Sequence, residues 1–450
     1  MATSYGLGLA GLGDLAAQSS HSDYKALVCV FLYGGNDHAN TLIPFDPANY
    51  AEYERLRGGR EGVALPRDQL AAQVLSVPEG QTLTDSIQYA LAPAMPRLKS
   101  LYDQGQMAAL LNVGPLLAPL TRAQYESSNT SAFPRPPKLF SHNDQQASWQ
   151  AFAPEGADQG WGGRLADIGM SANSNSMFTA MNVTGNAVFL NGSNASSFKL
   201  SARGPIKMYG IERQLYGQNT ASSALREIIG VSNGNVLASD YAQVTSRSIM
   251  YSDFILDALK NAPSSTKFGS GSSLQAQLSM VAQLVSARHN LGVTRQVFLV
   301  SMGGFDNHAN LTSKHQGLLG ELDTALHKFQ SAISGLGLQD QVTTFTASDF
   351  GRTLVSNGRG TDHGWGGHHF IVGGGVNGSA FYGTAPHVSD RTDDQVGRGR
   401  LLPTTSVDEY AATLAVWFGV SPSDVGYVAP NIGRFGNSDL GFMRREDDDR

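Results

Sequence analysis

The chain has 450 residues, of which 16% are charged and 9% aromatic, with 51 glycines and a formal net charge of -6. This composition is typical of a compact, loop-rich globular protein and excludes a disordered chain or a coiled coil. The absence of a basic cluster excludes a nucleic-acid surface, the single Cys29 excludes an internal disulfide, and no stretch approaches the ~20 apolar residues of a membrane span.

The N-terminal stretch MATSYGLGLAGLGDLAAQSS is rich in small residues and weakly apolar. It is similar to the distal part of an export signal of the Tat type, which would make the protein periplasmic or extracellular; the alternative is a tail without function. We therefore expect residues 1–22 to be a tail, residues 23–440 to form one α/β domain, and residues 441–450 to be a solvated acidic end.

Short apolar runs along the chain predict buried strands, at Ala26–Tyr33, Met107–Val113, Val297–Ser301, Val342–Ala347 and His369–Gly373. Longer helical patterns lie between them. Leucines spaced by four follow His315, and Ser406 with Glu409 makes a capping box. Strands that alternate with helices favour an α/β fold with a mostly parallel sheet and helices on both of its faces.

The region from about 191 to 273 differs from the rest because it is rich in Ser, Asn and Gly. Helical patterns occur near Ile249–Leu259 and Leu274–Ala287. We expect this region to be an insertion or cap on the α/β domain.

Three predicted strands run into glycine and then an acidic residue. GGND follows the first and brings Asn36 and Asp37, MGGFDNH brings Asp306 and His308, and SDFGR brings Asp349 and Arg352. Ligands of open parallel sheets bind at the carboxyl ends of the strands, and three carboxylates gathered there repel one another unless a cation neutralises them. The pattern predicts a divalent metal site; the alternative is that each acid caps a turn or helix.

Two further stretches bear on this site. His363, in GTDHGWGG, precedes a predicted strand, whereas His368 and His369 alternate across it and one of them is expected to pack in the core. Ser141, in KLFSHNDQQASWQ, stands at a predicted helix start, where the helix dipole and a metal would activate its hydroxyl. It could equally be an N-cap with Asp144 in the first turn.

A set of sequence blocks then identifies a family. The chain resembles the DUF1501 family of exported bacterial proteins, which is distantly similar to the alkaline phosphatase/sulfatase superfamily. The blocks are LVCVFLYGGNDHANTLIP, FSHNDQQASWQ, GWGGRLAD, MGGFDNHANL, SDFGRT and GTDHGWGGHHFIVGGGV.

The resemblance implies an alkaline-phosphatase-like sheet with metal ligands at its carboxyl edge and a nucleophile at a helix start. Ser141 takes the place of the nucleophile. The ligands would be Asp37, Asp306, His308, Asp349 and His363.

The sequence departs from the superfamily pattern in two places. Asp306 and His308 are two residues apart instead of four, with Asn310 at the fourth place, and Phe350 stands after Asp349 where a histidine is usual. These departures favour a single metal, or a site without metal. His38 and His315 are candidate substitutes, although histidines in such positions are more often surface residues.

Two hypotheses follow. In the first, the protein is an exported hydrolase of phosphate or sulfate esters that uses a divalent metal (zinc, manganese or calcium) and Ser141, with Arg352 gripping the anion and Asn36 and Asn40 donating hydrogen bonds to the substrate. In the second, it is a non-catalytic secreted binding or matrix protein on a degenerate form of the same fold, binding calcium or nothing. The substrate, the metal and the oligomeric state stay open.

Overall fold

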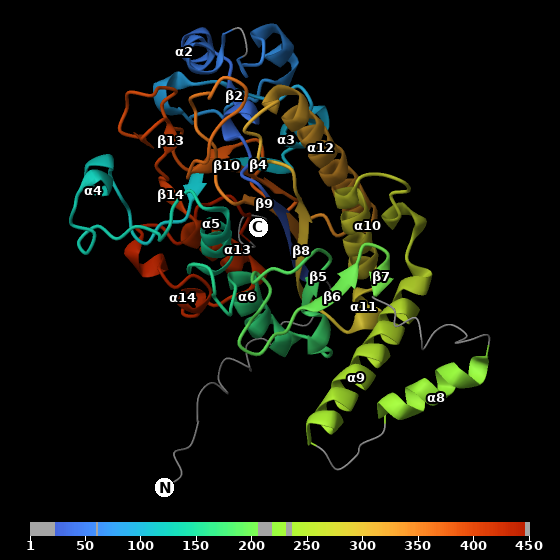
Figure 1. The fold of residues 1–450 in the computed structure, drawn as a ribbon. Helices are drawn as coiled ribbons and strands as arrows, with labels where there is room; N and C mark the ends of the chain where they lie inside the picture. The colour runs from blue at the N-terminus through green and yellow to red at the C-terminus, as the bar shows by residue number, and fades with distance from the viewer. Residues whose placement is uncertain (1–22, 60–61, 206–217, 231–235, 446–450) are drawn as a thin grey trace.

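The computed structural model describes residues 23–59, 62–205, 218–230 and 236–445 (Figure 1). The stretch 1–22, with its predicted export signal, and the last residues of the acidic end lie outside the described residues. No helix in these ranges is long and apolar enough to cross a membrane.

The centre of the molecule is a sheet in the order β11-β4-β10-β9-β1-β8-β5-β6-β7, with β14 paired to β4. Its long strands confirm the five predicted from the apolar runs. Their pairing is parallel between β1, β8, β9 and β5, whereas β10 is antiparallel to both β9 and β4. The strands are β1 (Lys25–Leu32), β4 (Met107–Gly114), β5 (Ala180–Asn182), β6 (Phe198–Ser201), β7 (Gly204–Pro205), β8 (Arg295–Met302), β9 (Val342–Ser348), β10 (Gly367–Val372), β11 (Phe381–Tyr382) and β14 (Thr405–Ser406).

Helices cover both faces of this sheet, as the sequence predicted (Figure 1). Alternate residues of β1 point to opposite faces, so Val28 belongs to the core that contains α3, α10 and α12, and Cys29 to the core that contains α5, α6 and α13. The helices are α2 (Pro47–Arg57), α3 (Pro96–Asp103), α4 (Arg122–Glu126), α5 (His142–Ala151), α6 (Trp161–Gly169), α8 (Asn219–Gly230), α9 (Val236–Ala258), α10 (Ser273–Ser286), α11 (Arg288–Leu291), α12 (Leu311–Gly335), α13 (Val407–Phe418) and α14 (Val425–Val428).

Local sequence signals set several of these helices. The capping box of Ser406 and Glu409 is formed at the start of α13, with the Ser406 hydroxyl accepting from the Glu409 backbone N–H at 3.0 Å. α12 contains the leucines spaced by four, with Leu322 and Leu326 buried. The helical patterns of the region 191–273 correspond to α9 and α10, and α9 begins earlier than its pattern indicated.

The strand order decides where functional side chains meet. β1 lies between β8 and β9 and parallel to both, so the segments that follow these strands leave the sheet at the same edge. β10 runs the opposite way, with Ile371 opposite Phe345, so the segment that precedes β10 reaches this edge as well. Short pairs complete the structure, β2 (Leu42–Pro44) with β3 (Tyr89–Leu91) and β12 (Gln395–Val396) with β13 (Arg400–Leu401).

Candidate metal centre

The turn after β1 brings the ends of its two neighbours together. Gly34 and Gly35 have φ angles of 114° and 82°, in the region that favours glycine. A Cβ on Gly34 would lie 2.4 Å from the backbone nitrogen of Asp306, and one on Gly35 would lie 2.3 Å from the ring of Phe350. Only glycines allow the segments after β8 and β9 to approach β1 this closely.

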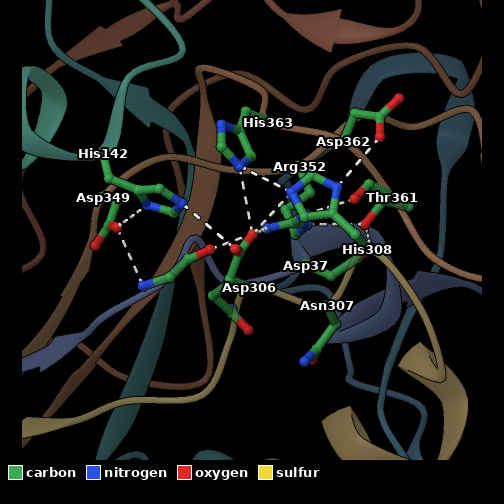
Figure 2. A network of polar contacts seen from close by, with 12 residues as sticks. Asp37, His142, Asp306, Asn307, His308, Asp349, Arg352, Thr361, Asp362 and His363 are labelled. Carbon is green, nitrogen blue, oxygen red and sulfur yellow. Dashed lines mark hydrogen bonds and ion pairs between the residues drawn. The ribbon is translucent and has the colours of Figure 1, made fainter.

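The carboxylate of Asp306 is the centre around which three imidazoles gather (Figure 2). The Nε2 atom of His308 lies 3.0 Å from Oδ1 of Asp306, that of His363 lies 3.3 Å from the same oxygen, and that of His142 lies 3.6 Å from Oδ2. Asp306, His308 and His363 come from the predicted set. His142, the first residue of α5, does not.

The other ring nitrogen of each histidine has an acceptor. Nδ1 of His142 lies 2.6 Å from Oδ2 of Asp349, Nδ1 of His363 lies 2.8 Å from the carbonyl oxygen of Phe140, and Nδ1 of His308 lies 3.3 Å from Oδ1 of Asp362. An acceptor at Nδ1 fixes the proton there, which leaves the Nε2 lone pair of a neutral ring directed at Asp306. Metal-bound histidines are commonly oriented in this way.

The short distance between two of these rings indicates that a proton or a cation belongs between them. Nε2 of His308 and Nε2 of His363 are 2.9 Å apart. Two neutral rings with protonated Nδ1 atoms would present lone pairs to each other at this distance, which is unfavourable. A proton or a cation between them removes the repulsion.

The donor set fits a metal ion. One ligand atom from each of His142, Asp306 and His363 lies within 4.8 Å of the other two. The separations of 3.3 Å from Asp306 to His363 and 3.6 Å from Asp306 to His142 are compatible with bonds of about 2.0–2.2 Å that meet at one ion. Imidazole nitrogens together with one carboxylate suit zinc or manganese, whereas calcium prefers an all-oxygen shell. His308 lies beside this group of three, where it contacts Asp306 and His363.

The electrostatics of the centre follow from its neighbours. Burial favours the neutral form of Asp306, but the hydrogen bond and charge of Arg352 outweigh burial and lower the pKa of this carboxyl below its usual range. The hydrogen bond to Asp349 raises the pKa of His142, and burial lowers that of His363. A metal must displace protons from such rings, so its affinity is expected to depend on pH.

Asp349 acts through His142. The carboxylate is fully buried, and its Oδ2 atom also accepts from the backbone N–H of Gly34 at 3.1 Å and from Nε2 of Gln146 at 2.9 Å. With these contacts the side chain orients an imidazole, and we place it behind the ligands and not among them as first expected.

Asp37 lies outside the group of ligands. Its Oδ2 atom accepts from Arg57 at 2.7 Å and from the hydroxyl of Thr361 at 2.8 Å, and its Oδ1 atom accepts from the backbone N–H of Asn40 at 3.0 Å. Both Asp37 and Arg57 are buried, at 1% and 0% exposure. In this structure the predicted metal ligand Asp37 is one half of a buried ion pair.

The predicted substrate contacts Asn36 and Asn40 also belong to this buried network. Oδ1 of Asn36 accepts from Nε2 of His315 at 2.8 Å, and Oδ1 of Asn40 accepts from the hydroxyl of Tyr53 at 2.7 Å. Both asparagines are buried, with their side-chain oxygens in contact with protein groups. His38 and His315, expected at the surface, are buried too, as are His368 and His369.

Arg352 is fully engaged by protein groups. It is buried and donates to Oδ1 of Asp306 at 2.9 Å, to the carbonyl oxygen of Gly34 at 2.9 Å, and to both oxygens of Thr361. Its guanidinium thus contacts Asp306 in this structure, where the sequence predicted a grip on an anion. An antiparallel backbone bridge joins Arg352 to His363, which explains how residues far apart in this loop reach one site.

Ser141 begins α5 as predicted, beside His142 in the chain. Its side chain makes no hydrogen bond to the first helical turn's backbone. The hydroxyl donates to Oδ2 of Asp144 at 3.0 Å, and Asp144 is buried. The serine is thus an N-cap in position only, with its oxygen next to a carboxylate that can accept a proton.

Comparisons with known proteins agree with the predicted family. The model of the family described as "Protein of unknown function (DUF1501)" matches residues 24–407. No curated protein matches the sequence significantly.

Several solved structures match this chain over most of its length, but with low TM-scores and low sequence identity. The structure of Ps i-CgsB in complex with k-i-k-neocarrahexaose has a TM-score of 0.37 and 9% identity, and covers 92% of this chain and 77% of its own. The lipoteichoic acid synthase LtaP from Listeria monocytogenes has a TM-score of 0.35 and 9% identity, with coverages of 96% and 80%. The soluble domain of lipooligosaccharide phosphoethanolamine transferase A from Neisseria meningitidis has a TM-score of 0.35 and 9% identity, with 95% of each chain covered. Scores this low carry no conclusion about activity.

Proposed function

We propose that this chain, which belongs to the DUF1501 family, is a metal-dependent hydrolase of phosphate or sulfate esters. The family description assigns no function, so the proposal rests on the site. The observation that carries it is the convergence of three Nε2 atoms on the carboxylate of Asp306, each ring held by an acceptor at Nδ1. The proposed ligands are His142, Asp306, His308 and His363.

The centre is open enough for a substrate. The side chains of His142 and Asp306 are 30% and 46% exposed, whereas Asp349 and Arg352 behind them are 0% exposed. A bound divalent ion would supply Lewis-acid stabilisation of the negative charge on the transferred group. The guanidinium of Arg352 is held by protein groups, so in this proposal it does not stabilise the charge on the transferred group.

Ser141 is the proposed nucleophile. Its oxygen would form the new bond to phosphorus or sulfur while the bond from that atom to the ester oxygen breaks and the Ser141 proton passes to Asp144, 3.0 Å away. The ester oxygen would leave as an alcohol after taking a proton from water, and the resulting hydroxide would take the proton from Asp144. Water would then hydrolyse the seryl ester. Its position at the start of α5 adds the positive end of the helix dipole.

The test combines metal analysis with activity. The purified protein is expected to contain about one zinc or manganese per chain and to hydrolyse phosphate or sulfate monoesters in a substrate panel. Asp306→Asn should lose the metal, and Ser141→Ala should keep the metal and lose at least about a hundredfold in kcat. Asp424→Asn, an exposed aspartate on another face, is the matched control and should change neither.

Other results of these experiments would reject one part of the proposal. Metal-free protein would reject the centre, and a fully active Ser141→Ala variant would reject the nucleophile. Bound metal without hydrolysis of any ester would favour the non-catalytic binding protein. Export belongs to the same proposal and rests on the small-residue stretch at residues 1–22, and cell fractionation tests it.

A further inference from the structure

An open cavity of about 250 Å³ lies along α5, the helix that begins with His142, and is assigned no role by the chemistry above. Four of its lining residues, Asn143, Gln146, Ala147 and Gln150, come from α5, the helix that begins with His142. Their spacing of three and four places them on one face of the helix. The cavity therefore shares a wall with the helix that presents a metal ligand.

A direct contact joins the cavity to the centre. Gln146 lines the cavity and donates from Nε2 to Oδ2 of Asp349 at 2.9 Å, the same oxygen that holds Nδ1 of His142. Only the side chain of Gln146 would separate a group in the cavity from the carboxylate of Asp349, which orients His142. An ester whose charged end met the metal would extend its other end into this space.

The lining is polar and mostly uncharged. Side-chain amides come from Asn143, Gln146, Gln150 and Asn186, and a phenol comes from Tyr33. Burial raises the pKa of Tyr33 to about 12, so this hydroxyl stays neutral at physiological pH. Amides and a phenol offer both donors and acceptors, which is what hydroxyl groups, themselves donors and acceptors, require.

Charge narrows the choice of ligand. Glu155 is the acid among the described lining residues, and none of them is Lys or Arg. Oε1 of Glu155 accepts from Nδ2 of Asn143 at 3.2 Å. The nearby cation Lys199 lies outside the lining and is held by Oδ1 of Asn186 at 2.7 Å, so an anionic group in the cavity would meet a carboxylate of the lining and no cation of the lining. A neutral occupant therefore suits the cavity. The volume lies below the roughly 300–1,000 Å³ typical of drug-sized ligands and suits a single ring.

We propose that this cavity is the leaving-group subsite for a neutral, hydroxyl-rich group such as a sugar ring, which makes the substrates sugar phosphates or sugar sulfates. This inference rests on the proposed ester hydrolase. The hydrolysed bond would join the sugar oxygen to phosphorus or sulfur at the metal centre, and the free sugar would leave from the cavity.

The experiment measures binding of neutral sugars to the full, metal-loaded chain by calorimetry and saturation-transfer NMR. The probes are glucose, galactose, N-acetylglucosamine and their short oligomers, with a dipeptide series as the competing class. Ala147→Trp fills the cavity and should weaken binding of the preferred sugar by roughly tenfold or more. Ala72→Trp, at an exposed position elsewhere, is the matched control and should bind as the wild type does.

A second variant covers the case in which the tryptophan disturbs folding. Asn143→Ala removes one amide from an exposed position and should weaken sugar binding by a smaller factor, with metal content unchanged. Failure of all sugars to bind, preference for peptides, or equal binding by Ala147→Trp overturns the inference.

Hydrolysis separates this inference from the proposed function. If simple aryl phosphates or sulfates are hydrolysed but sugar esters have no advantage in kcat/KM, the subsite is wrong and the hydrolase stands. If sugars bind in a manner sensitive to Ala147→Trp but no ester is hydrolysed, the hydrolase is wrong, and the cavity is a sugar site without a leaving-group role.

Discussion

At the residue scale, the centre depends on side chains that do not bind the metal. Asp349 holds Nδ1 of His142, Phe140 offers its carbonyl to His363, and Asp362 faces His308. Such partners fix the tautomer and raise the basicity of the ligand. In the proposed centre, Asp349, first expected to bind the ion, instead orients one of the histidine ligands.

Asp349→Asn tests this role. The amide keeps the shape but loses the charge that orients and activates His142, so metal affinity should fall by about 10–100-fold. Competition with a chromophoric chelator measures it, and Asp424→Asn again serves as the control. Unchanged affinity would show that Asp349 has no part in holding the ligand.

The sequence could indicate part of this centre and not all of it. Asp306, His308 and His363 were predicted because they stand at the ends of recognisable strands. His142 could not be identified in the same way, because periodicity does not fix the direction of the first side chain of a helix. Asp37 was misassigned because its partner Arg57 lies twenty residues away on α2, and nothing in the local pattern pairs them.

At the element scale, the decisive feature is the turn that follows β1. It was visible as a Gly-Gly pair, and the buried strands around it were predicted from their apolar runs. The antiparallel direction of β10 was not predicted, because a short buried run has the same pattern in either direction. That direction brings His363 to the edge shared with Asp306.

Gly34→Ala should damage both the fold and the centre. The new Cβ would lie 2.4 Å from the backbone nitrogen of Asp306 at a φ of 114°, so strain and displacement together should cost at least about 2 kcal/mol and weaken metal binding. Urea unfolding and metal titration measure the two effects.

Gly156→Ala is the matched control for that substitution. Its φ is also positive, at 99°, but a Cβ there meets nothing within 4 Å. It should cost only about 1 kcal/mol and leave metal affinity as in the wild type. Equal behaviour of the two variants would mean that the contact between Gly34 and Asp306 is unimportant.

At the scale of the whole molecule, the interior contains several neutral histidines. Burial lowers the pKa of His38 and of His315 to about 4 and that of His369 to about 3. In the unfolded chain a histidine has a pKa of about 6.5. Between these values the unfolded chain binds more protons, so the free energy of unfolding falls as pH falls.

Stability should therefore decrease from pH 7 to pH 4.5, by on the order of 1–3 kcal/mol for each of these histidines. Asp408 acts in the opposite sense, because burial raises its pKa to about 6 and the folded chain takes up its proton first. Urea unfolding at a series of pH values measures the balance. The exposed His289→Ala variant should have the same profile as the wild type, and a flat profile above pH 5 would contradict the expectation.

The backbone of Gly34 has one more consequence. Its N–H binds the acid that follows β9, and its carbonyl binds the guanidinium that holds the acid that follows β8. Two carboxylates on opposite sides of the central strand thus take their positions from the backbone of one glycine, through the two successive amides that flank its Cα. A one-residue insertion or deletion at Gly34 would displace both carboxylates together. The outer loops can therefore change in length one at a time during evolution, whereas these two carboxylates are expected to be kept or lost together.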